Sequence, residues 1–116
     1  MSPGRALVLA AAAPIESSPL RLEARPAPVP APGEILVRVS ACGVCRTDLH
    51  IVEGELPLVR ASVVPGHQVV GRVVGAGANA RRFEPGARVG IAWLRGTCGE
   101  CEACRSIHEA TSIDVI

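Results

Sequence analysis

The sequence has few aromatic residues and no lysine. Its 116 residues include no Tyr, one Phe and one Trp, and all twelve basic residues are Arg. So few rings cannot form the stacking platforms that single-stranded nucleic acid requires, and a net charge of +1 gives no field that attracts a polyanion. No nucleic-acid partner is therefore expected, and the core is expected to be aliphatic, built from Val, Leu and Ala.

Long hydrophobic runs are also missing. No stretch approaches the roughly 18–20 consecutive apolar residues of a membrane-spanning helix, so no membrane partner is expected. The apolar run 6–13 follows Arg5 and superficially fits a secretory signal. Clustered thiols suit a reducing compartment better, so we interpret the run as a first strand and expect a soluble, cytoplasmic chain.

Short strands separated by Gly and Pro dominate the pattern. No window longer than about two turns shows a helical period, and only a short turn or helix is expected at 47–54. The strand at 34–41 should be half-buried, with Ile35, Val37 and Val39 on one side, and the strand at 67–77 should be buried. These features predict a small β-barrel or sandwich, with strands at 5–12, 20–25, 34–41, 67–77 and 87–93.

A proline-rich segment, residues 26–33, interrupts the strands. Proline cannot donate to a sheet ladder, so an extended surface connector is expected. Such a segment could also serve as a ligand for an aromatic groove, but it is short and unrepeated, and a strand pattern resumes at once. The stiff connector is the preferred interpretation.

The motif Gly75-x-Gly77-x-x-Ala80 fits a dinucleotide-binding fingerprint. That fingerprint functions only where a helix begins, because helix N–H groups meet the pyrophosphate. Pro85 and Gly86 would end a helix here before its second turn. A tight turn between strands is therefore expected.

Three of the five cysteines lie in Cys98-x-x-Cys101-x-x-Cys104, which is metal-ligand spacing. A closed structural zinc site needs four ligands, and His108 could supply the fourth. A four-iron cluster is less favoured because it prefers four thiolates. Reduced thiols without a metal remain an alternative.

The pair Cys42-x-x-Cys45 has two interpretations. A redox pair needs its first Cys at a helix N-terminus, which the sequence does not offer, so Cys42 is expected to be a small buried hydrophobe. Cys45 instead begins a run of polar groups that is suggestive but unspecific on its own. His67, next to a Val-rich strand, would by itself be a structural histidine more often than a ligand. The polar run comprises Arg46, Thr47, Asp48 and His50.

Taken jointly, these residues resemble the N-terminal catalytic domain of zinc-dependent alcohol dehydrogenases of the medium-chain dehydrogenase/reductase superfamily. The resemblance covers residues 5–106. It rests on ACGVCRTDLH (41–50), PGHQVVGRVVGAGANA (65–80), the turn from Phe83 to Val89 and the cysteine run. It implies a mainly β, GroES-like, partly open β-barrel with short helices and a Cys-rich zinc lobe.

The resemblance implies a role for each matching residue. Cys45 and His67 match catalytic-zinc ligands, and Asp48 would accept the ring N–H of His67. Thr47 matches the hydroxyl that hydrogen-bonds the alcohol, and His50 matches the group that passes its proton to solvent. Arg46 matches a contact to the pyrophosphate of NAD or NADP. The reaction implied is hydride transfer between a primary or secondary alcohol and NAD(P)+.

This sequence departs from the family pattern at several positions. Gln68 stands where the family has Glu, so a neutral amide replaces a carboxylate near the zinc. Ser112 stands where the fourth structural cysteine is expected, which leaves His108 as a substitute beside Cys98, Cys101 and Cys104. The resemblance implies that the family's third catalytic ligand and its Rossmann domain both lie beyond position 116, so the catalytic zinc is expected to be weakly held in this chain.

We therefore expect a GroES-like domain over residues 1–97 and an incomplete zinc lobe with an atypical tail over residues 98–116. The tail suggests a truncated or frameshifted product, and the chain alone is expected to be inactive. Exposed strand edges favour a homo-oligomer. The alternative function is a zinc-binding β-barrel module without catalysis.

Overall fold

The computed structural model describes residues 4–57, 62–92 and 100–105. Strands β1 to β5 span Gly4–Leu9, Leu20–Arg25, Ile35–Cys42, Val69–Ala76 and Arg88–Ile91. The helices are the 3-10 turn η1 (Ile15–Ser17), α1 (Arg46–Glu53) and α2 (Glu102–Arg105). All five predicted strands are therefore present, and the short helix predicted after Cys45 is α1.

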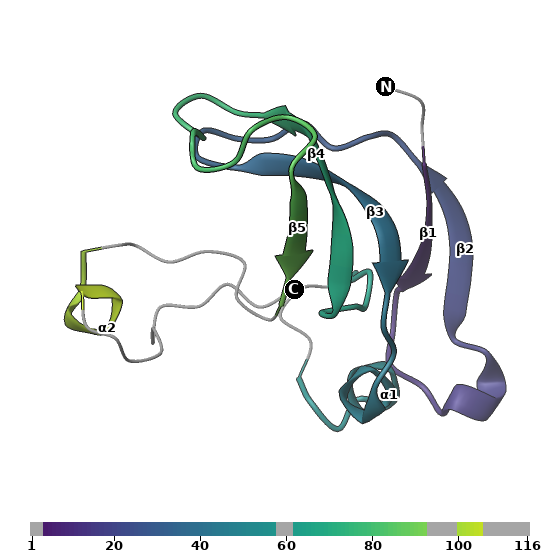
Figure 1. Ribbon diagram of the computed structural model, residues 1–116. Helices are drawn as coiled ribbons and strands as arrows, with labels where there is room; N and C mark the ends of the chain where they lie inside the picture. Colours follow the sequence, from purple (N-terminus) through teal and green to yellow (C-terminus); the bar gives the residue numbers. More distant parts are fainter. Residues whose placement is uncertain (1–3, 58–61, 93–99, 106–116) are drawn as a thin grey trace.

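The strands form two antiparallel sheets, β1–β2 and β3–β4–β5. Figure 1 shows them side by side, with α1 at the end toward which β3 and β5 run. A bridge between Leu9 and Val63 extends β1, with N–H···O distances of 2.8 and 3.1 Å. The fold therefore places α1, which lies between β3 and β4 in the sequence, at one end of the three-stranded sheet.

The strand β3 differs from its prediction. Its register shifts twice against β4, between Leu36 and Val37 and between Val39 and Ala41. Each shift turns the following side chains relative to the sheet, so the expected two-sided alternation is lost. Val39, expected on the half-buried side, is 56% exposed.

The core is small and aliphatic, as predicted, although no Ala is buried among the residues that the structure describes. The strand predicted to be buried, β4, is buried on one face only: Gly71 and Val73 are buried, whereas Arg72 and Val74 are exposed. The sheet therefore has one covered face and one open face. The buried apolar residues are Val8, Leu9, Val52, Val73 and Val89.

The C-terminal end of helix α1 is held by two sets of contacts. Gly54 ends it with φ +82°, where glycine meets no steric penalty, and its N–H reaches the carbonyls of the last turn. The segment between β1 and β2 anchors the same end, because Ala13 N–H donates to the Val52 carbonyl (3.1 Å) and Ile15 N–H donates to the Glu53 carboxylate (3.0 Å). The hairpin thus fixes the helix that carries the candidate site.

The glycine motif between β4 and β5 forms a turn, as predicted. The Ala80 N–H donates to the Gly77 carbonyl at 3.3 Å, and no helix follows within the described residues up to 92. The connector 26–33 contains no strand or helix and ends in a turn, in which Glu34 N–H donates to the Ala31 carbonyl at 3.0 Å. Within the described part of the chain, no helix has the length and apolarity to cross a membrane.

Candidate metal centre

Three side chains from two separate segments converge beside α1. Cys45 precedes the helix, Asp48 lies in its first turn, and His67 lies two residues before β4. One ligand atom from each of the three lies within 4.8 Å of the others. The Cys45 Sγ and the His67 Nε2 are 3.2 Å apart. We call these residues the Cys45 cluster.

Asp48 holds the cluster together through both of its carboxylate oxygens. Its Oδ2 accepts the backbone N–H of Cys45 at 2.9 Å, which satisfies a donor at the helix N-terminus. Its Oδ1 lies 3.2 Å from the Nδ1 of His67. Asp48 and His67 are 7% and 5% exposed, so water competes little for these groups. One carboxylate therefore positions both the cysteine and the histidine.

The donor set fits zinc. A thiolate and an imidazole on one tetrahedral zinc have their S and N atoms about 3.5 Å apart, given bond lengths of roughly 2.3 and 2.0 Å. The observed 3.2 Å separation needs to open by only about 0.3 Å to match this. The Nδ1 of His67 faces a carboxylate, which is the usual partner of a zinc-bound imidazole. Cys45 and His67 are therefore suited to hold zinc, with Asp48 orienting the imidazole.

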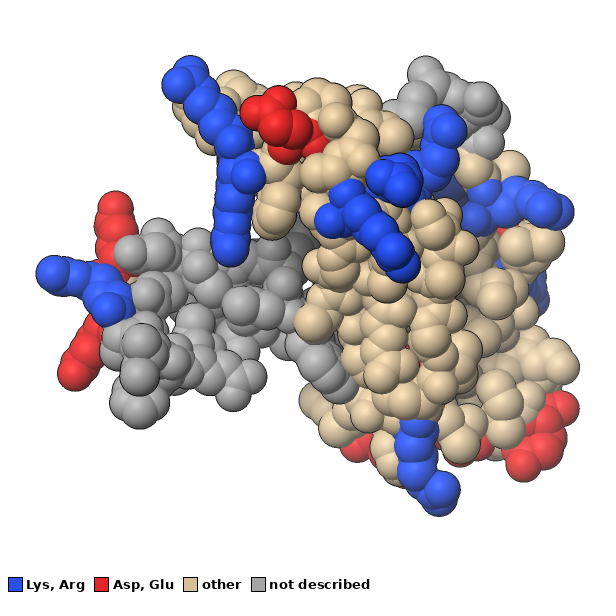
Figure 2. All heavy atoms as spheres, in the orientation of Figure 1, with Lys and Arg blue, Asp and Glu red and all other residues tan. Residues whose placement is uncertain are grey.

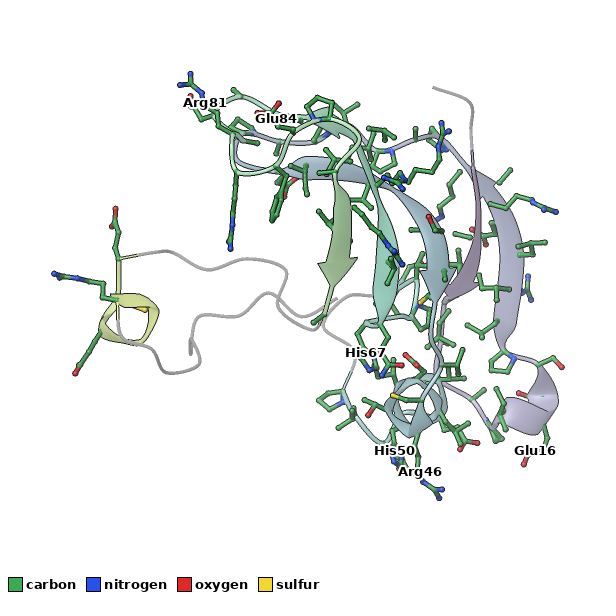
Figure 3. The ribbon with its side chains drawn as sticks, viewed as in Figure 1. Glu16, Arg46, His50, His67, Arg81 and Glu84 are labelled. Atoms are coloured by element: carbon green, nitrogen blue, oxygen red, sulfur yellow. The ribbon has the colours of Figure 1, made fainter. Side chains whose placement is uncertain are left out.

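Figure 3 shows His67 directed toward α1 from the sheet, with Arg46 and His50 drawn beyond the helix from it. Residues two apart on a helix face different ways, so Asp48 and His50 cannot both face the cluster. His50 Nδ1 instead contacts the Glu55 carboxylate just past the helix. Arg46 is exposed and Thr47 half-buried in the first turn. The structure therefore does not join His50 to the Cys45 cluster, and the sequence analysis missed Glu55.

Gln68 lies beside the cluster and packs on Gly43. Its carbonyl accepts the Gly43 N–H at 2.9 Å, and a Cβ at Gly43 would lie 2.8 Å from its side-chain oxygen. Cys42 is exposed, which corrects the expectation of burial. A helix follows the cysteine pair, as expected for 47–54, but its cap is the second cysteine, Cys45. A redox pair would need the first cysteine there.

The cysteine run lies largely outside the described residues. Cys98 and His108 are not among them, and of Cys104 the structure describes only its place in α2. Cys101 precedes that helix and is half-buried, and its carbonyl accepts the Arg105 N–H at 3.0 Å. The structural-zinc prediction therefore stays a prediction.

Known proteins place the chain in a family. The model of the alcohol dehydrogenase GroES-like domain matches residues 31–115. This chain belongs to that family. Its mainly β fold agrees with the GroES-like prediction, and the resemblance to zinc-dependent alcohol dehydrogenases is confirmed.

Relatives and solved structures agree with this assignment. A "Probable alcohol dehydrogenase AdhA" of Mycobacterium tuberculosis is 54% identical over an alignment of 97 residues, and the match covers 79% of this chain and 28% of that protein. An alcohol dehydrogenase of Rhizobium meliloti is 44% identical over 89 residues, or 76% and 26% of the two chains. A cobalt- and zinc-bound thermostable alcohol dehydrogenase from Pyrobaculum aerophilum is 28% identical, with a TM-score of 0.82 over 99% of this chain and 35% of that one. The chain spans about a quarter of the length of these curated relatives.

Proposed function

We propose that this chain is the N-terminal, zinc-holding part of an NAD(P)-dependent alcohol dehydrogenase that interconverts an alcohol and an aldehyde or ketone in the cytoplasm. The convergence of Cys45, Asp48 and His67 within 4.8 Å is the observation that supports it most strongly. Family membership and relatives named alcohol dehydrogenases support the same proposal.

The ligands Cys45 and His67 would hold the zinc, which, when bound, polarises the oxygen of an alcohol or carbonyl substrate. Asp48 keeps the imidazole in one orientation by facing its Nδ1, so the Nε2 stays directed at the Cys45 sulfur. Because Asp48 is buried beside His67, its negative charge also offsets part of the positive charge that the site would take up.

The helix α1 supplies the remaining groups. Thr47, beside Asp48, would accept or donate a hydrogen bond at the substrate hydroxyl. His50 would accept the proton that leaves the substrate side, and its contact with Glu55 at the helix end holds the imidazole near solvent. Arg46, exposed at the helix start, would contact the cofactor's pyrophosphate. These assignments follow the family motif.

A chimaera tests the proposal. The aligned segment of this chain replaces the corresponding segment of the Mycobacterium relative, and NAD(P)-dependent oxidation of primary and secondary alcohols is measured. Turnover is expected, and Cys45→Ala should lower kcat/KM by at least about 100-fold. Arg21→Gln, an exposed change on β2, should leave it unchanged.

A folded chimaera that holds zinc yet oxidises no alcohol would overturn the dehydrogenase proposal and support the non-catalytic zinc module. The 116 residues assayed alone are expected to show no turnover, because no segment among those described forms the glycine-turn-and-helix unit that binds a dinucleotide.

A further inference from the structure

A cavity lies away from the Cys45 cluster, between the β1–β2 hairpin and β3. Its volume is about 600 Å³, within the range of small-molecule sites. Nine of its twelve lining residues are apolar or glycine, three are arginine and none is acidic. The apolar lining includes Pro26, Pro28, Leu36, Val37, Val64 and Val74, and the arginines are Arg5, Arg25 and Arg38.

The wall of the cavity is pre-formed. Pro26 and Pro28 come from the connector and offer no N–H, so this wall is apolar and stiff. The connector is fixed where it turns into β3, because Ala31 N–H donates to the Glu34 carboxylate at 3.0 Å. The turn after β4 packs closely against the connector, because a Cβ on Gly77 would lie 2.0 Å from the Ala31 carbonyl oxygen. A rigid wall lowers the entropic cost of holding a ligand.

Positive charge gathers on the same side of the molecule. Arg38 lies opposite Arg72, and Arg72 lies opposite Arg88, so three guanidinium groups cross the β3–β4–β5 sheet in one row. Like charges directly opposite one another destabilise a sheet. All three arginines are exposed, and Figure 2 shows basic side chains gathered over this part of the surface. An anion bound there would relieve the repulsion.

Few carboxylates of the protein neutralise the charges of the cavity arginines. Arg25 lies 3.5 Å from the Glu23 carboxylate, with both side chains about half exposed. Among the described residues, Arg5 and Arg38 form no ion pair with a carboxylate. Two guanidinium groups at the mouth of an apolar cavity are therefore available to an external anion.

We propose that this cavity binds an amphipathic anion, a carboxylate with an unbranched aliphatic tail. The tail would lie along the apolar lining formed by Leu36, Val37 and Val74, and the carboxylate would meet Arg38 and Arg5. Guanidinium groups bind carboxylates in a bidentate manner, and each buried methylene adds about 0.8 kcal/mol of hydrophobic free energy. None of the lining residues belongs to the Cys45 cluster, so this site is separate from the proposed dehydrogenase centre.

Isothermal titration of the 116-residue chain with decanoate, below its micelle-forming concentration, tests the proposal. One molecule is expected to bind, and binding should weaken as salt rises. Butyrate, with the same headgroup, and decyltrimethylammonium, with the same tail, should each bind at least about tenfold more weakly. These two probes separate the charge contribution from the apolar contribution.

Substitutions locate the site. Arg38→Gln should weaken decanoate binding about fivefold or more, and Val74→Asp should do the same by placing a carboxylate beside the tail. Both positions are exposed, and circular dichroism checks that the fold is retained. Arg21→Gln, with the same loss of charge outside the cavity, should change the affinity less than about twofold.

Equal affinity for decanoate and the cationic amphiphile would overturn the proposal. So would an Arg21→Gln effect as large as that of Arg38→Gln, because binding would then follow overall charge and not the cavity. Binding of decanoate only as micelles would count against it in the same way.

Discussion

Two parts of this chain contain candidate metal ligands, and the candidates are brought together by different means. Cys45 and His67 are 22 residues apart, and only the fold places their Sγ and Nε2 atoms 3.2 Å apart. Cys98, Cys101 and Cys104 lie within seven residues, so the local chain can direct them to one ion. The first set depends on the whole domain, whereas the second depends on a short segment.

The largest effect is expected from removing a ligand of the fold-dependent set. Cys45→Ala should cost one zinc equivalent, with affinity at that site falling by more than about 100-fold, because a ligand contributes more than the groups behind it. Cys101→Ala should remove a different zinc equivalent, the one held by the cysteine run. Native mass spectrometry of both variants and the double variant measures the zinc content. A shared loss in the two single variants would show that the sets are not separate sites.

Destabilising the core should separate the two sets further. Leu9 is fully buried, so Leu9→Ala should lower the free energy of unfolding by about 3 kcal/mol. In urea, zinc at the Cys45 cluster should be released at the unfolding midpoint, whereas the cysteine run should retain zinc beyond it. Leu7→Ala, at a residue 51% exposed, is the matched control and should move the midpoint little. Simultaneous release from both sites in urea would contradict the distinction.

Asp48→Asn tests the orienting carboxylate without removing a ligand. The amide keeps an acceptor for the Cys45 N–H but loses the charge facing His67, so zinc affinity should fall roughly 10- to 100-fold. Competition with a zinc chelator measures this. Unchanged affinity in a folded variant would show that Asp48 serves only as a helix cap.

The smallest effect is expected at the far end of α1. Glu53→Gln weakens the bond from Ile15 N–H and should cost about 0.5–1 kcal/mol of unfolding free energy. Zinc affinity should change less than about threefold, because the helix start keeps its own contacts. Glu16→Gln, on the neighbouring 3-10 turn, is the control. A fall in zinc affinity of more than about threefold would mean that the β1–β2 hairpin sets the geometry of the Cys45 cluster directly.

Local patterns predicted β3, β4 and β5 well because runs rich in Val and Ile, bounded by Gly and Pro, favour strands. The turn at Gly77 was predictable for the same reason, since Pro85 rules out a helix. The register of β3 was not predictable. Its two shifts arise from pairing with β4, and they expose Val39 although the sequence alternates there.

The candidate site shows the same division. Spacing alone left His67 as an ordinary histidine, and the family motif was needed to join it to Cys45. The structure then shows which atoms meet: the carboxylate of Asp48 accepts the Cys45 N–H with one oxygen and faces His67 with the other. The contact between His50 and Glu55 had no signal in the motif, because it depends on the chain turning back at Gly54.

The central claim is that Cys45 and His67 hold zinc together. Zinc X-ray absorption on the variant with Cys98, Cys101 and Cys104 all changed to Ser tests it most directly, because it leaves only the fold-dependent set. We expect one bound zinc with one sulfur at about 2.3 Å and imidazole nitrogen at about 2.0 Å. A folded variant with no zinc, or with zinc that lacks imidazole scattering, would contradict it.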